Sequence, residues 1–171
     1  DTGTNMIKTL TGVLQHADNS DDDSASTVAK AMWQGALRNS SGNSGVILSQ
    51  LFNGLSQSLS GKDFLDVKKF GMALQIANVK AYDAVSNPTE GTILTVLKYA
   101  ENAAREEISF TASLSKVSEA ALEAVADSPN QLPILREAGV VDAGGLGLWI
   151  IFEAIRLYVE TSSPIMNLPD Q

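Results

Sequence analysis

Apolar residues recur along this chain with the spacing of an α-helix, and no segment sustains the alternation of a β-strand. Six segments show the helical spacing most clearly, and the third of them is expected to run to about residue 85. The positions that define the six stripes are Val28, Met32 and Gly35; Ile47, Leu51, Leu55 and Leu59; Phe64, Val67, Phe70, Leu74 and Val79; Ile93, Val96, Leu97 and Ala100; Leu114, Val117, Ala121, Leu122 and Val125; and Leu148, Ile151, Phe152, Ile155 and Val159. The sequence therefore predicts an all-α fold, a bundle of about seven helices with short connections.

Polar residues mark several of the expected helix boundaries. Ser24 follows the acidic run 21–23 and suits a helix N-terminus, because its hydroxyl can cap the helix and acidic groups favour that end. Thr89, directly after Pro88, can cap the helix that follows. The prolines within residues 128–133 are expected to bracket a short turn.

Length and composition favour one globular domain. The chain has 171 residues, of which 44% are hydrophobic, and we expect a domain over residues 1–161 followed by a tail or linker over 162–171. It contains no cysteine, which excludes disulfides and thiolate metal sites. The longest apolar run, 146–152, is too short to span a bilayer. These features predict a soluble protein of the cytoplasm without a membrane span.

The charge of the chain limits its partners and its chemistry. The formal net charge is −8, which argues against a nucleic-acid surface because such a surface needs a basic face. A nucleotide remains possible, since a divalent metal can offset phosphate charge. The single histidine, His16, is expected to lie on the surface, so nucleophilic catalysis by a triad has no suitable residues.

Four short stretches are rich in glycine and in hydroxyl or amide side chains: residues 1–5, 40–45, 88–92 and 142–145. The last three lie where a helix is about to begin, and helix starts converge on one end of a bundle whose helices alternate in direction. The free N–H groups of a helix start favour an anion such as phosphate. A plain loop between helices is the alternative for residues 40–45, which precede the apolar helix expected from Val46.

Other nucleotide patterns are absent. Residues 61–63 lack the preceding glycine, the following hydroxyl and the strand of a P-loop, and the glycines of 144–147 follow no strand. Carboxylates remain as metal ligands. Asp1 is the leading candidate because small polar groups follow it, whereas the acidic run 21–23 is expected to be a solvated loop or cap.

Four motifs in this order resemble a known family. DTGTNM (1–6), SGNSGVILSQ (41–50), PTEGTILTV (88–96) and AGVVDAGGLGL (138–148) are similar to the nucleotide-binding domain of bacterial fatty-acid kinase, itself similar to the nucleotide-binding subunit of dihydroxyacetone kinase. The resemblance covers residues 1 to about 159. It implies a barrel of about eight antiparallel helices, the first preceding this chain, with ATP and two Mg²⁺ ions bound at one end.

The resemblance also implies roles for individual residues. Asp1 matches a metal-binding acid, a second ligand Asp is expected upstream, and Asp1 and Thr2 are the candidate catalytic residues. Ser41 stands where the family commonly has Arg, so no role for an Arg is transferred to it. Asp142 either accepts a hydrogen bond from a ribose hydroxyl or holds the shape of its loop. The candidate nucleotide-binding residues are Thr2, Gly3, Asn5, Ser41, Gly42, Asn43, Ser44, Gly45, Thr92, Asp142, Ala143 and Gly144.

The reaction implied by the resemblance is transfer of the γ-phosphoryl group of ATP to a fatty acid, giving an acyl-phosphate. A DegV-type fatty-acid-binding protein presents the acid, and a homodimer is possible. Thr2 favours this type, because dihydroxyacetone-type enzymes usually have His there. Two alternatives stay open: a dihydroxyacetone (glycerone) kinase-type nucleotide-binding subunit, and a helical lipid-binding module without catalysis.

Overall fold

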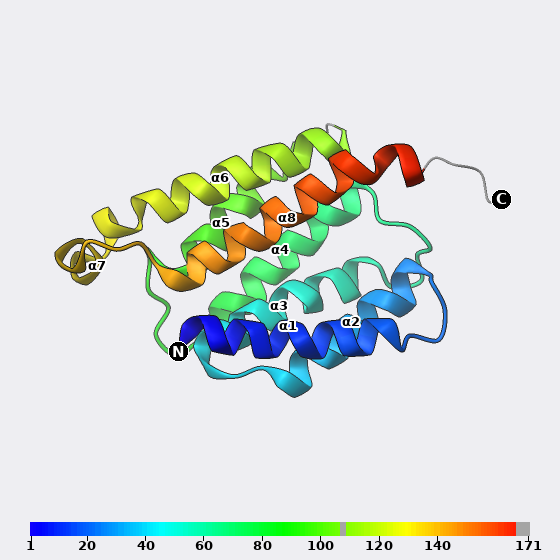
Figure 1. Ribbon diagram of the computed structural model, residues 1–171, viewed down its shortest axis with the longest axis horizontal. Coiled ribbons are helices and arrows are strands. Elements are labelled where there is room, and N and C mark those ends of the chain that lie inside the picture. The colour runs from blue at the N-terminus through cyan, green and yellow to red at the C-terminus, as the bar shows by residue number, and fades with distance from the viewer. Residues whose placement is uncertain (107–108, 167–171) are drawn as a thin grey trace.

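The computed structural model describes residues 1–106 and 109–166, and these residues form eight α-helices and no β-strand (Figure 1). The prediction of an all-α fold is confirmed. The helices are α1 (Thr2–Asp18), α2 (Ala25–Asn39), α3 (Gly42–Ser58), α4 (Val67–Asp83), α5 (Ile93–Ala103), α6 (Phe110–Gln131), the short α7 (Pro133–Ala138) and α8 (Ala143–Met166).

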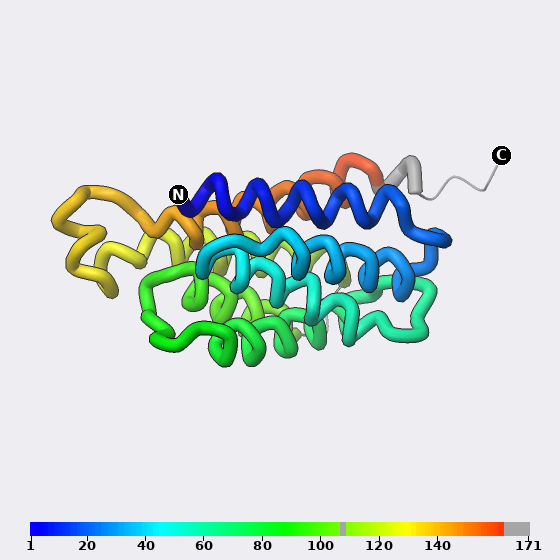
Figure 2. The backbone as a smooth tube through the Cα atoms, turned by 90° about the horizontal axis from the view of Figure 1, so that it is seen from below, coloured from blue at the N-terminus to red at the C-terminus, as the bar shows by residue number. Residues whose placement is uncertain are grey.

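The seven long helices alternate in direction and close into a ring (Figures 1 and 2). From α1 to α6 each helix packs on the next along the chain, α8 packs on α6, and α8 also contacts α1. The starts of α1, α3, α5 and α8 therefore lie at one end, which we call the proximal end, and the starts of α2, α4 and α6 lie at the distal end. The short α7 projects at the proximal end (Figure 1).

The core is built from the apolar stripes of these helices. Leu48, Leu74, Leu97, Leu114 and Phe152 come from five different helices and are each no more than 1% exposed. Burying a side chain of this size contributes roughly 1.5–3 kcal/mol, so the shared apolar face is what holds the ring together. None of the helices formed by the described residues is long and apolar enough to cross a membrane.

Two predicted helix starts are wrong. The third predicted helix begins at Val67, because Asp66 caps it there by accepting a hydrogen bond from the backbone N–H of Lys69 at 2.8 Å. Phe64 lies before this cap and is 80% exposed, so it is not part of the stripe. The helix expected from Val46 begins four residues earlier, at Gly42, so the glycine-rich segment forms its first turn.

The predicted turn at 128–133 is wrong for its first half, because α6 continues through Pro129. A proline cannot donate to the carbonyl four residues before it, which here is that of Val125. The hydroxyl of Ser128 donates to this carbonyl instead, at 2.7 Å. The same hydroxyl accepts the backbone N–H of Asp142 at 3.0 Å, so the proline site also anchors the start of α8.

The remaining boundaries give a mixed result. Ser24 caps α2 as predicted, by accepting from the N–H of Thr27. Thr89 does not cap α5; Thr92 does, by accepting from the N–H of Leu94. The last helix runs to residue 166, past the expected boundary at 161, and residues 167–171 lie outside the described residues. The division into a domain and a tail stays a prediction.

Candidate functional site

A pocket of about 200 Å³ lies at the proximal end, where four helix starts meet. Its walls come from the first turns of α1, α3, α5 and α8 and from the loop between α4 and α5, so the polar stretches expected to converge do so. The lining residues are Thr2, Asn43, Ser44, Ile47, Val85, Asn87, Thr89, Thr92, Ile93, Leu94, Asp142 and Gly144.

Six of the thirteen candidate site residues line this pocket and seven do not. Those in the lining are Thr2, Asn43, Ser44, Thr92, Asp142 and Gly144. Those outside the lining are Asp1, Gly3, Asn5, Ser41, Gly42, Gly45 and Ala143. All seven of the latter lie within a few residues of a lining residue along the chain, so the structure places them as neighbours of the pocket.

The start of α3 brings backbone donors to the pocket. Its N-cap residue, Ser41, has an extended backbone and makes no side-chain capping hydrogen bond. The first helical hydrogen bond runs from the N–H of Gly45 to the carbonyl of Ser41 at 3.2 Å. The N–H groups of the three residues before Gly45 have no acceptor within the helix, and Asn43 and Ser44 among them line the pocket.

Gly42 fixes how α3 begins. Its φ is +62°, a left-handed conformation that only glycine adopts without cost. A side chain here would also meet the amide of Asn5, since a Cβ on Gly42 would lie 2.4 Å from Asn5 Nδ2. Asn5 and Gly42 therefore fit against each other, and the contact sets the position of α3 relative to α1.

Asp1 has a structural contact of its own. Its Oδ1 accepts a hydrogen bond from the backbone N–H of Thr4 at 2.8 Å and so caps α1. Among the described residues, no three His, Asp or Glu side chains come together as a metal site. Mg²⁺ commonly takes only one or two carboxylates and completes its shell with water and substrate phosphates. A Mg²⁺ ion held by Asp1 together with a phosphate ligand therefore stays a prediction.

Asp142 holds the start of α8. Its Oδ2 accepts a hydrogen bond from the N–H of Gly145 at 2.7 Å. Burial raises the pKa of Asp142, although hydrogen bonds from the backbone N–H groups of Gly145, Ile93 and Gly144 favour its charged form. Because Ile93 opens α5, the carboxylate ties α8 to α5 across the pocket. Its loop-shaping contact is therefore present, and a contact with a ribose stays a prediction.

Sequence reasoning missed part of the lining. Thr89 belongs to the stretch 88–92 but is not among the candidate site residues, and neither are Val85 and Asn87, since the helix before them was expected to extend to about residue 85. That helix ends at Asp83, which frees these residues for the loop. The change of composition at Asn87-Pro88 was the available signal. The apolar lining residues Ile47, Ile93 and Leu94 could not be singled out, because they belong to the same stripes as the core.

The electrostatics of the lining are simple. Asp142 is the one charged side chain among the lining residues, and no Lys or Arg is among them. His16 lies in the last turn of α1, at the distal end, where its Nδ1 is 2.9 Å from the carbonyl oxygen of Gly12. The pocket thus offers hydroxyl, amide and backbone donors, with an apolar wall, and Asp142 is the one titratable side chain in its lining.

The comparisons with known proteins match this architecture. The family model described as the DAK2 domain matches residues 1–157. Protein YloV of Bacillus subtilis is 42% identical to the chain over 157 residues, which cover 90% of this chain and 28% of that protein. An uncharacterized protein of Staphylococcus epidermidis is 40% identical with the same coverage, and one of Staphylococcus aureus is 39% identical over 90% of this chain and 29% of its own length.

The chain therefore spans a little over a quarter of the length of these relatives. The DAK2 domain is the nucleotide-binding domain of dihydroxyacetone kinase-type kinases. With a match over almost its whole length, the chain belongs to the DAK2 domain family.

Proposed function

We propose that the chain is the ATP-binding domain of a kinase that transfers the γ-phosphoryl group of ATP to a fatty acid. The observation that carries this proposal is the uncapped start of α3, which opens into a pocket that also holds Thr2 and Thr92. Free N–H groups and the helix dipole favour a phosphate at such a start. The apolar residues of the same lining offer contacts for the nucleoside part.

A divalent metal belongs to this proposal. The lining has one carboxylate and no cationic side chain, so the charge of a triphosphate has to be offset by a bound ion. Asp1 is proposed to hold Mg²⁺, with a second Asp upstream as a further ligand, and Asp1 and Thr2 are proposed to act in the transfer. Mg²⁺ supplies neutralisation of phosphate charge when bound, and phosphoryl transfer depends mainly on such neutralisation and on positioning.

The acceptor is proposed to be a carboxylate rather than a hydroxyl. A fatty-acid carboxylate is ionised at neutral pH and needs no general base. The absence of His from the lining and the position of His16 at the other end suit that acceptor. A DegV-type fatty-acid-binding protein would present the acid, and the product is an acyl-phosphate. The cytoplasm is the proposed location, and a homodimer is compatible with the proposal.

Calorimetric titration with ATP, with and without Mg²⁺, of the chain extended upstream to include the second ligand Asp tests the proposal. We expect binding that requires Mg²⁺. Asn43→Ala removes a polar side chain from the lining and should weaken binding about tenfold, since a hydrogen bond to a charged group contributes roughly 1.5–3 kcal/mol. Asn102→Ala is the matched control, because Asn102 is exposed near the distal end of α5 and should leave the affinity unchanged.

Three results would contradict the proposal in different ways. An absence of Mg²⁺-dependent ATP binding would leave the lipid-binding module as the better function. ADP formation driven by dihydroxyacetone with a cognate partner, and not by a fatty acid with its carrier, would favour the glycerone kinase-type subunit. Equal loss of affinity in Asn43→Ala and Asn102→Ala would place the nucleotide elsewhere.

A further inference from the structure

The loop between α4 and α5, residues 84–92, forms one wall of the pocket through Val85, Asn87, Thr89 and Thr92. We propose that Glu90, which does not line the pocket, is the positioning residue that holds this wall in place. Its effect on a nucleotide rests on the proposed function, whereas its effect on the loop can be measured without any ligand.

The carboxylate of Glu90 joins the two helices that flank the loop. Its Oε1 accepts a hydrogen bond from the hydroxyl of Tyr82, in the last turn of α4, at 2.8 Å. Its Oε2 accepts one from the hydroxyl of Thr95, in the first turn of α5, at 2.5 Å. The ammonium group of Lys98 lies 3.7 Å from Oε1. One side chain of the loop thus binds both of its ends.

The contact with Thr95 extends into the backbone of the loop. Thr95 is 2% exposed, and its hydroxyl also accepts the N–H of Gly91 at 2.8 Å. Gly91 has a φ of +80°, a left-handed conformation in which this N–H is directed to Thr95. Because a hydroxyl that donates in one direction accepts in another, the carboxylate fixes how Thr95 receives Gly91.

Two threonines of the same loop, Thr89 and Thr92, belong to the pocket. Thr92 caps α5, and its hydroxyl donates to the carbonyl of Thr89 at 2.7 Å. The chain of contacts therefore runs from Glu90 through Thr95 and Gly91 to the two hydroxyl-bearing residues of the wall.

The charge state of Glu90 suits this role. Burial opposes its ionisation, but the hydrogen bonds from Thr95 and Tyr82 and the charge of Lys98 outweigh burial and lower its pKa. Glu90 is therefore ionised at neutral pH and only accepts hydrogen bonds. A glutamine of the same shape replaces it only in part: its amide oxygen can accept from one of the two hydroxyls, whereas its NH₂ group offers no acceptor to the other. A buried hydroxyl left without its acceptor is costly.

Glu90→Gln in the full chain tests the proposal with two readouts. Hydrogen exchange of the Gly91 and Thr92 amides, followed by NMR, should become at least tenfold faster, because opening of the loop no longer breaks the Thr95 contact. The dissociation constant of MgATP, measured well below the unfolding midpoint, should rise at least fivefold. Glu123→Gln, at an exposed position of α6, is the matched control and should change neither readout.

The two readouts separate the outcomes. Unchanged exchange at Gly91 overturns the proposal whatever happens to ATP. Faster exchange with unchanged ATP affinity, in a chain whose wild type binds ATP, reduces Glu90 to a stabilising contact and also overturns it. If the wild-type protein binds no MgATP, the proposed function is contradicted. Hydrogen exchange of the Gly91 and Thr92 amides then decides by itself whether Glu90 holds the wall in place.

Discussion

One helix start at the proximal end, that of α3, differs from the other starts of the long helices. At the distal end, α2, α4 and α6 each begin with a side chain that accepts a backbone N–H three residues on: Ser24, Asp66 and Ser109, at 3.3, 2.8 and 3.2 Å. At the proximal end, α1, α5 and α8 also begin with a side chain that accepts a backbone N–H, namely that of Asp1, Thr92 and Asp142. Ser41 makes no such bond at the start of α3. A capped start has satisfied its donors within the chain, whereas α3 keeps donors available to a ligand.

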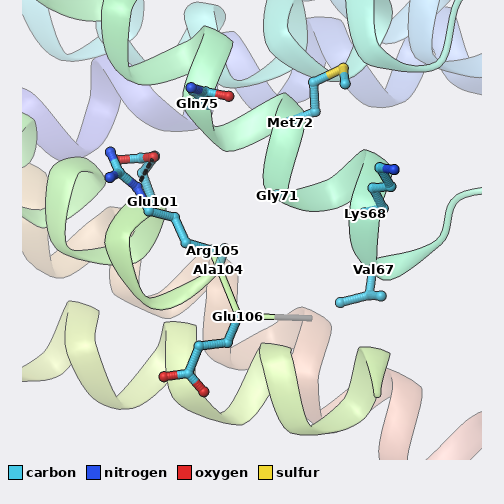
Figure 3. Close-up of a pocket in the computed structure, with 9 residues that line it drawn as sticks. All are labelled: Val67, Lys68, Gly71, Met72, Gln75, Glu101, Ala104, Arg105 and Glu106. Atoms are coloured by element: carbon cyan, nitrogen blue, oxygen red, sulfur yellow. Dashed lines mark hydrogen bonds and ion pairs between the residues drawn. The ribbon is translucent and has the colours of Figure 1, made fainter. Parts of the chain in front are cut away.

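The hollows also differ in whether their polar groups are already paired within the chain. One hollow at the distal end, of about 350 Å³, has four charged side chains in its lining, from α4, from α5 and from the residues directly after α5 (Figure 3). Glu101 accepts two hydrogen bonds from Arg105, at 2.7 and 3.1 Å, and Glu106 pairs with Lys116. Its acids are thus neutralised by the chain itself. The smaller proximal pocket has uncommitted donors, so volume is a poorer guide to a site than unsatisfied chemistry.

Alanine variants of Gly42 and Gly61 should give the largest change in stability among the tests of this difference. Both have a positive φ, +62° and +70°, but a Cβ on Gly42 would meet the Asn5 amide at 2.4 Å while Gly61 has nothing within 4 Å. Alanine at Gly61, at the distal end, carries only the conformational cost of roughly 1–2 kcal/mol. Gly42→Ala adds the contact with the end of the Asn5 side chain, which can turn away, and we expect a loss of about 2 kcal/mol, a lower midpoint by roughly 4–8 °C. Thermal unfolding followed by circular dichroism measures both.

The double variant Gly42→Ala/Asn5→Ala identifies the cause. If the Asn5 amide is what the new side chain meets, truncating it returns much of the difference between Gly42→Ala and Gly61→Ala. Equal losses at Gly42 and Gly61 would show instead that the start of α3 is no more constrained than an open loop.

The fold could be predicted from the sequence because its stripes are long and regular. Leu74 and Leu97 are buried as their helical spacing requires. The errors fall where a local contact competes with the pattern. Phe64 has the spacing of the apolar stripe, but Asp66 caps the helix, which therefore begins at Val67. Pro129 predicts the end of a helix, but the Ser128 hydroxyl donates to the carbonyl that lacks a backbone partner. This contact depends on side-chain geometry and cannot be predicted from residue spacing.

The site could be predicted as a set of stretches but not as a set of contacts. The convergence of residues near Thr2, Asn43, Thr92 and Asp142 follows from alternating helix directions, and the pocket contains all four. The role of Glu90 could not be predicted, because it depends on hydroxyls from two helices meeting one carboxylate. A contact in which one carboxylate accepts from two helices cannot be predicted from the spacing of residues along the sequence.

Removing a helix cap at the distal end and adding one to α3 should change the stability by a smaller amount. Ser24→Ala removes a cap at the distal end and should cost about 1 kcal/mol without changing ATP affinity. Ser41→Asp places a capping carboxylate on the uncapped start and should stabilise by up to about 1 kcal/mol, while its charge weakens MgATP binding about tenfold. Unfolding midpoints and calorimetry on the same samples check both. Stronger ATP binding by Ser41→Asp would show that phosphate does not approach α3.

The smallest expected effect concerns how stability depends on pH. The carboxylates of Asp66 at the distal end and Asp142 at the proximal end should change this dependence in opposite directions. Hydrogen bonds from Lys69, first from its side chain and then from its backbone, lower the pKa of Asp66, whereas burial raises the pKa of Asp142. The ionised form of Asp66 therefore stabilises the fold above its unfolded pKa of about 3.9, and this contribution is lost as the pH falls through its native pKa. For Asp142 the protonated form is the favoured one, so its contribution is lost as the pH rises through its raised native pKa.

Asp66→Asn and Asp142→Asn separate these signs, because asparagine keeps a capping oxygen and removes the charge. Asp66→Asn should lower the midpoint at pH 7 and flatten its decline between about pH 5 and pH 3. Asp142→Asn should leave the midpoint at pH 7 equal or slightly higher, since no charge has to be buried beside Ile93 and Gly145. Thermal midpoints between pH 3 and pH 7 distinguish the two. A larger loss at pH 7 in Asp142→Asn would mean that its backbone hydrogen bonds outweigh burial, and that the proximal end is held by charge just as the distal end is.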